Sequence, residues 1–222
     1  MPNCKYFLLG GGLAAVSAVR QLRKLDATAT IVLAASEPHL PYDRPPLSKQ
    51  YLRGEMDRTK LFLDPSQFYP ERNPNTSTKS KVKRLEVKDR RVVLEKNEEI
   101  IRYEKLLIAT GGRPRPLEVP GVSLQGIYYL RTIEDCEAIR TAAAPGRRAL
   151  VVGAGFIGME LAASLTQRGV KVTVVEVTPS IWSRFLDSSM ASFFLTYCEE
   201  RGISFLTGES IAEFKEIGRA HV

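Results

Sequence analysis

Apolar runs of strand length alternate with helix-spaced apolar positions along this chain, and the alternation occurs twice. In its first occurrence, Lys5 to Leu9 is a short apolar run, and Leu13 to Leu25 has apolar residues at helical spacing. Thr30 to Ala34 is the next apolar run. The apolar face of the intervening helix is expected to hold Val16, Val19 and Leu22. These segments predict one βαβ unit.

The same order returns in the second half of the chain. Ala149 to Val152, Ile157 to Arg168 and Val172 to Val175 predict another strand, helix and strand. A linker before this repeat is marked by Pro114, Pro116 and Pro120. We therefore expect an α/β protein with two Rossmann-like, three-layer (ββα-type) dinucleotide-binding domains, both incomplete. Their expected bounds are residues 1–115 and 116–216.

The segments between the two units predict a stiff loop, a hairpin and a closing strand. Pro38 to Lys49 is rich in proline, which favours a rigid extended loop. Val82 to Val87 and Arg91 to Glu95 alternate like the two strands of a hairpin with its turn near Asp89. Lys105 to Ile108 predicts a buried strand, and the two glycines and the proline that soon follow mark its end.

Each βαβ unit contains a glycine-rich turn between its first strand and its helix. The turns are Leu9-Gly10-Gly11-Gly12-Leu13-Ala14-Ala15 and Val152-Gly153-Ala154-Gly155-Phe156-Ile157-Gly158. In such a turn the glycines let the backbone approach a pyrophosphate and let the helix pack on the strand, and the helix N-terminus offers unpaired N–H groups. An acid, Glu37 or Glu176, follows each second strand. Two such turns, each with its strands, its helix and an acid after the second strand, predict two dinucleotide-binding sites.

Composition indicates that bound cofactors supply the chemistry. The chain has 222 residues, 44% of them apolar and 26% charged, which is typical of a globular protein. Its three cysteines are scattered and it has two histidines. These numbers and spacings predict neither a redox disulfide motif nor a metal site.

The net charge of +7 is compatible with nucleic acid, an acidic membrane or an acidic protein partner. The basic residues are not interleaved with aromatic residues, so we expect no nucleic-acid binding. The apolar stretch Ala149 to Leu165 contains Glu160, which argues against a membrane span. The chain enters its first strand with no room for a signal peptide, so a cytoplasmic location is expected.

The combined motifs resemble those of the FAD-dependent pyridine nucleotide oxidoreductases. They are the paired turns, the loop Pro-Tyr-Asp-Arg-Pro-Pro-Leu-Ser-Lys and the strand end Ile-Ala-Thr-Gly-Gly-Arg-Pro. The loop is similar to that of the ferredoxin and rubredoxin reductases, with apoptosis-inducing factor and monodehydroascorbate reductase as relatives. The resemblance covers about residues 4 to 214 and is weakest at Asn73 to Ser80, which is more polar than the strand usual there.

The resemblance places FAD on the first turn. It implies that Glu37 accepts hydrogen bonds from the adenosine ribose, and that Lys49 and Glu160 form a catalytic pair near the flavin. A simple salt bridge between domains, with no catalytic consequence, is the alternative for that pair. The expected FAD-binding positions are Gly10, Gly11, Gly12, Leu13, Ala14, Glu37, Arg44, Lys49, Val82, Ala109, Thr110, Gly111 and Arg131.

The resemblance places NAD(P)H on the second turn. A carboxylate at Glu176 would bind both ribose hydroxyls and repel a 2′-phosphate, which favours NADH over NADPH. Phe156 resembles the side chain that shields the flavin, although a plain core phenylalanine is the alternative. The expected positions on this side are Gly153, Gly155, Phe156, Ile157, Gly158, Glu160, Glu176 and Arg184.

The implied activity is electron transfer from NADH through FAD to a small acidic ferredoxin or rubredoxin. One alternative is a monodehydroascorbate reductase-like enzyme. Another is a redox-sensing flavoprotein whose main role is binding. The absence of cysteine from Leu47-Ser48-Lys49 argues against disulfide or oxygen reduction through a cysteine.

The resemblance also implies an N-terminal fragment that is inactive alone. The family's chain returns to its FAD domain with a Gly-Asp motif and continues into a further domain, and neither is found in this sequence. Residues 217–222 match the translation of a common sequencing adapter, so we expect them to be an artefact and the authentic sequence to end near Lys215 or Glu216.

Overall fold

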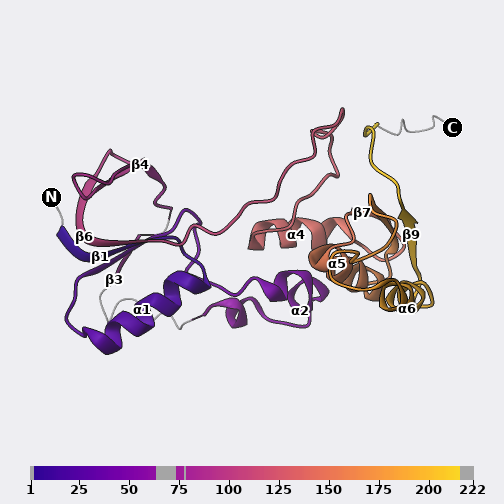
Figure 1. Cartoon of the computed structure of the whole chain (residues 1–222), viewed down its shortest axis with the longest axis horizontal. Helices are drawn as coiled ribbons and strands as arrows, with labels where there is room; N and C mark the ends of the chain where they lie inside the picture. The colour runs from indigo at the N-terminus through magenta and orange to yellow at the C-terminus, as the bar shows by residue number, and fades with distance from the viewer. Residues whose placement is uncertain (1–2, 64–73, 78, 216–222) are drawn as a thin grey trace. The chain divides into compact units, whose positions relative to one another are not determined.

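The structure is a computed structural model that describes residues 3–63, 74–77 and 79–215. The expected artefact at 217–222 therefore lies outside the described residues. The chain divides into two compact units, which are drawn in Figure 1. Unit 1 is built from the described parts of residues 1–43 and 58–112, and unit 2 from those of residues 44–57 and 113–222.

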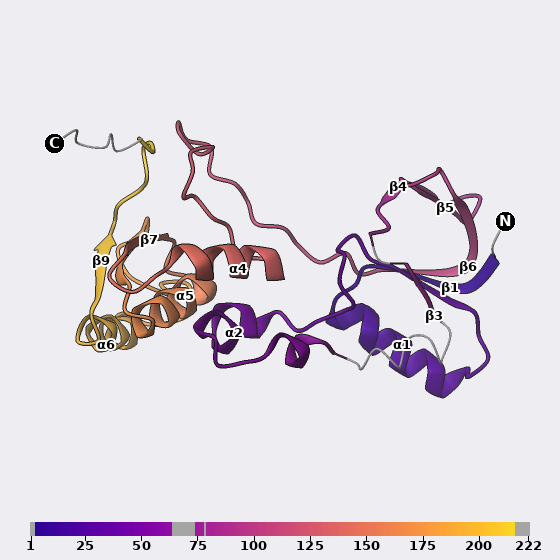
Figure 2. The same cartoon turned by 180° about the vertical axis from the view of Figure 1, so that it is seen from behind.

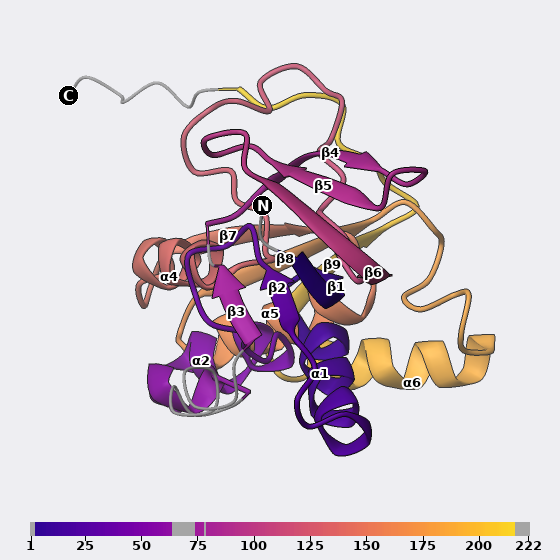
Figure 3. The same ribbon diagram turned by 90° about the vertical axis from the view of Figure 1, so that its left-hand side faces the viewer.

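Unit 1 contains a six-stranded sheet in the order β3-β2-β1-β6-β5-β4, with helix α1 (Leu13–Leu25) packed against it (Figure 3). The strands are β1 (Asn3–Leu9), β2 (Ile31–Ala34), β3 (Pro74–Ser77), β4 (Val82–Glu86), β5 (Arg91–Leu94) and β6 (Ile100–Ile108). Strand β1 pairs in parallel with β2 and β6, and β2 with β3. Strands β4, β5 and β6 pair antiparallel.

Alternation along the strands builds a core on each face of this sheet. On the helix side, Leu8 and Leu33 pack with Ala15 and Val19 of α1. On the other side, Phe7 packs in a cluster with residues of β2, β5 and β6. Successive strand residues point to opposite faces, so one buried strand supplies both cores.

Unit 2 contains a parallel three-stranded sheet in the order β7-β8-β9 together with the helices seen in Figure 2. Its strands are β7 (Arg148–Val152), β8 (Lys171–Glu176) and β9 (Ile203–Thr207). Its helices are η1 (Pro45–Ser48), α2 (Gln50–Arg53), α4 (Ile133–Ala142), α5 (Phe156–Gln167) and α6 (Ser188–Glu199). The proline-rich segment is thus part of the second unit.

The short helices η1 and α2 pack against α4 and α5 through buried side chains. Tyr51 and Leu52 are buried there. The Arg168 guanidinium donates to the Leu52 carbonyl at 3.3 Å and to the Arg140 carbonyl at 3.0 Å, so it joins the ends of α2 and α4. These contacts position the residues just before α2 for the site described below.

Most predicted elements are confirmed, including the hairpin whose turn lies between Val87 and Arg90. The second unit's helix begins one residue earlier than predicted, at Phe156, because Gly155 is its N-cap. The polar stretch within Asn73 to Ser80 contains strand β3, which pairs with β2. The apolar stretch Ala149 to Leu165 is β7, the glycine turn and most of α5. No helix in the described ranges is long and apolar enough to cross a membrane.

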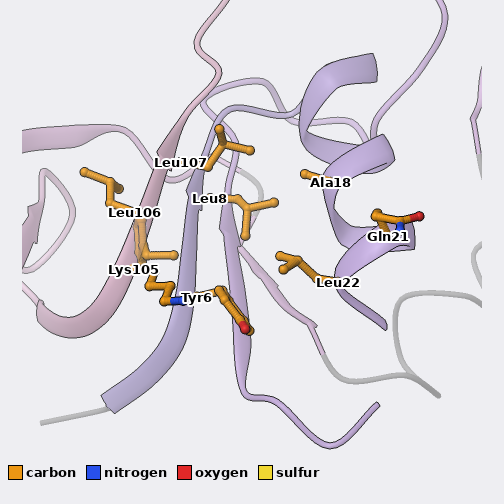
Figure 4. Close-up of a pocket in the computed structure, with 9 residues that line it drawn as sticks. Tyr6, Leu8, Ala18, Gln21, Leu22, Lys105, Leu106 and Leu107 are labelled. Carbon is orange, nitrogen blue, oxygen red and sulfur yellow. The ribbon is translucent and has the colours of Figure 1, made fainter. Parts of the chain in front are cut away.

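Two local predictions are wrong. Pro45–Ser48 is a 3-10 helix and not extended loop, because prolines in its first turn have the backbone angle that a helix start needs. The strand end at Lys105 to Ile108 is not buried: Leu107 is 38% and Ile108 58% exposed. Leu107 lines an apolar groove of about 300 Å³ between β6, β1 and α1, shown in Figure 4.

Candidate dinucleotide-binding sites

The first glycine turn follows β1 and leaves no room for side chains at two of its positions. The Gly10 amide donates to the Ala34 carbonyl at 2.9 Å, and Gly10 has φ +136°. A Cβ on Gly10 would lie 2.0 Å from the Ala109 carbonyl oxygen, and one on Gly11 would lie 2.6 Å from Cβ of Ala35. The turn therefore has to be glycine so that β1, β2 and β6 can meet there.

Helix α1 starts from this turn with open space at its N-terminus. Gly12 is the N-cap and makes no side-chain capping hydrogen bond, and a Cβ there would meet nothing within 4 Å. Leu13 and Ala14 in the first turn of the helix are exposed. Amides at such a helix start lack partners inside the helix and suit an anion.

The carboxyl ends of three strands meet beside the first turn. Ala109 donates its amide to the Leu9 carbonyl at 2.7 Å, so Ala109, Thr110 and Gly111 leave the sheet next to Gly10. Glu37 follows β2, and its carboxylate accepts a hydrogen bond from the Tyr42 hydroxyl. The predicted set of Gly10 to Ala14, Glu37 and 109–111 thus lies at one edge of the unit 1 sheet.

Val82 is the predicted position that packs away from this turn. Its half-buried side chain contacts the core cluster on the face opposite α1. The segment just before it reaches the same sheet edge, because Ser80 donates its amide to the Ala35 carbonyl at 2.8 Å. The Val82 side chain therefore does not face the first turn, whereas the backbone at Ser80, just before it, reaches the same sheet edge as that turn.

The second glycine turn repeats the geometry of the first with tighter helix packing. Gly153 has φ +98° and donates its amide to the Val175 carbonyl at 2.7 Å. A Cβ on Gly158 would lie 1.9 Å from the Gly153 carbonyl oxygen, whereas one on Gly155 would meet nothing within 4 Å. Gly158 therefore serves helix packing, and Gly155 leaves space at the N-terminus of α5.

Glu176 at the end of β8 holds its carboxylate against this second turn. One carboxylate oxygen accepts from the Ala154 amide at 2.7 Å. The other accepts from the Thr178 amide at 2.9 Å and from the Thr178 hydroxyl at 2.8 Å. Burial raises the Glu176 pKa, but these hydrogen bonds outweigh burial and hold the pKa below its ordinary value. An ionised acceptor therefore stands beside the turn at neutral pH.

An aromatic group surrounds the start of α5. The Phe156 ring lies 5.7 Å from the Trp182 ring and 5.0 Å from the Phe185 ring, centroid to centroid, yet Phe156 remains 55% exposed. Trp182 in turn lies 5.3 Å from Phe194 of α6. Phe156 is thus held at the surface rather than buried in the core. Ile157 beside it and Arg184 in the loop after β8 are also exposed.

Lys49 and Glu160 form the predicted ion pair. The Lys49 Nζ lies 2.6 Å from Oε2 of Glu160, and both side chains are about one-third exposed. Ser48 donates its hydroxyl to the same oxygen at 2.6 Å. Burial raises the Glu160 pKa, but the Lys49 and Ser48 hydrogen bonds and the Lys49 charge bring it below its ordinary value. Because Arg44 to Asp57 belongs to unit 2, this pair lies inside one unit.

The remaining two predicted cations lie side by side in unit 2. Arg44 donates to the Arg131 carbonyl at 2.6 Å, and the Arg131 amide donates to Asp135 at 2.9 Å. The Arg131 Nε is buried and has no hydrogen-bond partner within the part of the chain that the structure describes. A buried donor without an acceptor is costly, so this guanidinium is suited to an anionic ligand.

Sequence reasoning missed several residues that shape these sites. Ser48 and Tyr42 stand in the quoted proline-rich loop, but nothing in the sequence indicates which acidic residues they meet. Thr178 lies two residues after Glu176, a spacing at which a hydroxyl often binds a nearby acceptor. Trp182 and Phe185 lie in a loop without periodicity and gave no signal.

The residues that line the groove in Figure 4 include none from either glycine turn. The groove is lined by residues such as Tyr6, Leu22 and Leu106, and its wall is almost wholly apolar. Lys105 is the cation in its lining. It offers little to a charged dinucleotide, so we do not count it as a candidate cofactor site.

Comparisons with known proteins point to one family. A family model described as pyridine nucleotide-disulphide oxidoreductase matches residues 4–222. The chain is 36% identical over 213 residues to a probable ferredoxin reductase, CtmF, of Castellaniella defragrans, covering 96% of this chain and 52% of that protein. It is 39% identical over 196 residues to rhodocoxin reductase of Rhodococcus erythropolis, covering 88% and 46%. The chain thus spans about half the length of the curated relatives it matches.

Solved structures agree with this assignment. The chain matches the covalent putidaredoxin reductase–putidaredoxin complex with a TM-score of 0.91 and 30% identity, covering 97% of this chain and 52% of that one. It matches the ferredoxin reductase of the CYP199A2 system from Rhodopseudomonas palustris with a TM-score of 0.91 and 32% identity, covering 97% and 53%. The predicted α/β fold with two Rossmann-type domains is therefore confirmed.

Proposed function

The chain belongs to the pyridine nucleotide-disulphide oxidoreductase family, and we propose that the protein passes electrons from NADH through FAD to a small iron–sulfur protein. The observation that carries this proposal is the pair of glycine turns, each with an acid after its second strand. One turn would serve the flavin nucleotide and the other the nicotinamide nucleotide. The names of the relatives, which are reductases of ferredoxins and rubredoxins, support the direction of transfer.

The first turn fits a flavin nucleotide. Gly12 leaves open space where a pyrophosphate would meet the amides of Leu13 and Ala14, and Glu37 supplies a carboxylate for ribose hydroxyls. We assign the expected positions at Ala109 to Gly111 to this cofactor, together with Arg44, Lys49, Val82 and Arg131 by resemblance. When bound, FAD would accept a hydride and release single electrons.

The second turn fits NADH better than NADPH. Glu176 is ionised beside the Ala154 amide, where a 2′-phosphate would meet its negative charge and ribose hydroxyls would meet an acceptor. Gly155 and the exposed Ile157 in the first turn of α5 leave the approach to the pyrophosphate open, and Arg184 is exposed for a phosphate contact.

We assign Lys49 and Glu160 to the electrostatics around the flavin. The pair supplies a fixed cation whose orientation depends on a partly buried carboxylate. Groups held in place before the reaction cost no reorganisation during it. Phe156, which contacts two aromatic rings but is exposed, is assigned the role of shielding the flavin.

We further propose that the electron acceptor is a small acidic ferredoxin or rubredoxin met in the cytoplasm. The net charge of +7 supports an acidic partner, since opposite charges speed encounter. The putidaredoxin complex among the matching structures supports an iron–sulfur protein.

The test uses the protein extended to the length of its relatives, because the 222-residue chain is expected to be inactive alone. Its flavin absorbance is measured first, and then its NADH-dependent reduction of candidate acceptors. Bound FAD and saturation by a ferredoxin or rubredoxin are the expected results. Reduction of monodehydroascorbate without saturation by an iron–sulfur protein would replace the proposed acceptor. A protein that binds neither FAD nor NADH would overturn the proposal.

A further inference from the structure

The Glu160 carboxylate receives two donors on one oxygen. Oε2 lies 2.6 Å from Nζ of Lys49 and 2.6 Å from the Ser48 hydroxyl, which donates to it. The same hydroxyl lies 3.3 Å from the Pro45 carbonyl. Its single proton favours the carboxylate, because that acceptor is nearer and charged.

Ser48 is itself held firmly. It is 5% exposed, at the end of η1, and its carbonyl accepts a hydrogen bond at 2.6 Å from the hydroxyl of Ser164, which is 1% exposed. Ser164 lies one helical turn beyond Glu160 on the same face of α5. Glu160 therefore contacts the hydroxyl of Ser48, and Ser164 contacts its carbonyl. Arg53 donates to the Ser164 hydroxyl at 3.3 Å.

We propose that Ser48 is a positioning residue, whose hydroxyl fixes the Glu160 carboxylate in the orientation that meets the Lys49 ammonium. The Ser164 hydroxyl, which donates to the Ser48 carbonyl, holds the backbone of Ser48 in place. The consequence of this positioning for the flavin rests on the proposed function, but the contacts themselves do not. The Ser48 hydroxyl adds a second, buried donor to the oxygen that the one-third exposed Lys49 also contacts, and two donors restrict the carboxylate more than one does.

The other charged groups on the packed elements make their own contacts. Arg53 of α2 pairs with Glu55 at 2.7 Å. At the end of α5, Arg168 donates to backbone carbonyls of α2 and α4. On α4, Glu137 accepts from the Tyr51 hydroxyl at 2.6 Å, and Arg140 lies over the Tyr51 ring. Lys49 and Ser48 are therefore the groups to which the Glu160 titration should respond.

The experiment follows the Glu160 carboxyl carbon by NMR through a pH titration of the cofactor-free protein. Its signal is assigned by its loss in Glu160→Gln. In Ser48→Ala the Glu160 pKa should rise by about one unit, since the ionised form loses a charge-assisted hydrogen bond. Thr166→Val is the matched control on the same helix: its hydroxyl donates to the Ala162 carbonyl at 2.9 Å, so the Glu160 titration should not move.

A second pair of variants covers the case in which Ser48→Ala does not fold. Ser48→Thr and Ser48→Val have the same shape and differ in the hydroxyl, so the Glu160 pKa should be higher in the valine variant. An equal Glu160 pKa in wild type and Ser48→Ala, or in the Thr and Val variants, would overturn the inference. Failure to bind FAD or NADH would contradict the proposed function and leave the Glu160 titration unchanged. A failure of the proposed function can therefore be distinguished from a failure of the inference about Ser48.

Discussion

At the residue scale, the clearest constraint is the contact between Gly158 and the Gly153 carbonyl. A side chain on Gly158 would have to move backbone, because a Cβ would lie 1.9 Å from the carbonyl oxygen. Gly155, three residues earlier, is the N-cap of α5 and has open space where a Cβ would lie. The sequence pattern identified both positions as parts of one motif, and it is the structure that separates their roles.

This separation predicts different outcomes for two alanine variants. Gly158→Ala should lower the free energy of unfolding by roughly 1–3 kcal/mol, as other overpacked sites do, because α5 must shift on the turn. Gly155→Ala should lower it by less, roughly 0.5 kcal/mol, because its new methyl meets nothing within 4 Å and alanine is only a poorer N-cap than glycine. Urea unfolding of the two proteins measures both. A Gly158→Ala variant as stable as wild type would show that α5 can shift without loss of stability.

Glu176 gives the second prediction at this scale. Its carboxylate is ionised well into mildly acidic solution, because three donors hold its pKa below the ordinary value. Glu176→Gln keeps the shape but removes the charge that would repel a 2′-phosphate, so the ratio of Kd for NADPH to Kd for NADH should fall at least several-fold. Val177→Ala, at the exposed neighbour, is the control. A ratio unchanged in Glu176→Gln would mean that another group selects the coenzyme.

The same carboxylate predicts a pH dependence. A folded-state pKa below the unfolded value contributes stability above the unfolded pKa and loses it as pH falls through the folded pKa. The wild type should therefore lose more stability than Glu176→Gln on acidification below the ordinary glutamate range. Unfolding curves over an acid pH series check this, and parallel curves for the two proteins would contradict it.

At the scale of elements, the loop after β8 is tied to the start of α5 by aromatic rings. Trp182 lies against Phe156, and it holds a left-handed backbone conformation with φ +51° that is unfavourable for a bulky residue. Its indole nitrogen is buried without a hydrogen-bond partner among the described residues. Both features are unfavourable for the loop, so a rearrangement of Trp182 would relieve them.

We therefore predict that NADH binding changes the fluorescence of Trp182, the only tryptophan of the chain. A nucleotide at the second turn would displace the Phe156 ring from the indole. A titration with NAD⁺, which does not absorb tryptophan emission as NADH does, should change the emission spectrum, and Phe156→Leu should diminish the change. If NAD⁺ binds by calorimetry but leaves the spectrum unaltered, the loop does not respond.

The long helices and the strands were easier to predict than the segments that connect them and the side-chain contacts between elements. The periodicity of Leu13–Leu25 gave the bounds of α1, because one face packs on a sheet and the other meets solvent. The 3-10 helix at Pro45–Ser48 was missed, since prolines favour both an extended loop and a helix start. The Lys49–Glu160 pairing was predicted from the resemblance to the family. The hydrogen bond that Ser48 donates to Glu160 was not predicted, because it depends on how η1 packs on α5.

At the scale of the whole molecule, charge is the property that bears on partners. Lysines and arginines exceed acids by 32 to 25 in the chain. Such an excess attracts an acidic acceptor over distances up to the Debye length, about 10 Å at 0.1 M salt and longer in dilute buffer. Attraction of this kind acts on the rate of encounter more than on the lifetime of the complex.

The reduction of an acidic ferredoxin by the protein extended to the length of its relatives should accordingly slow as salt rises. Between roughly 0.01 and 0.3 M NaCl we expect kcat/KM for the ferredoxin to fall by about tenfold or more, while kcat changes little, because screening shortens the reach of the field. A neutral quinone acceptor is the control for direct effects of salt on the enzyme and should show no such fall. If kcat/KM for ferredoxin is as insensitive to salt as that for the quinone, the excess of basic residues serves something other than steering, and the acceptor is recognised by short-range contacts alone.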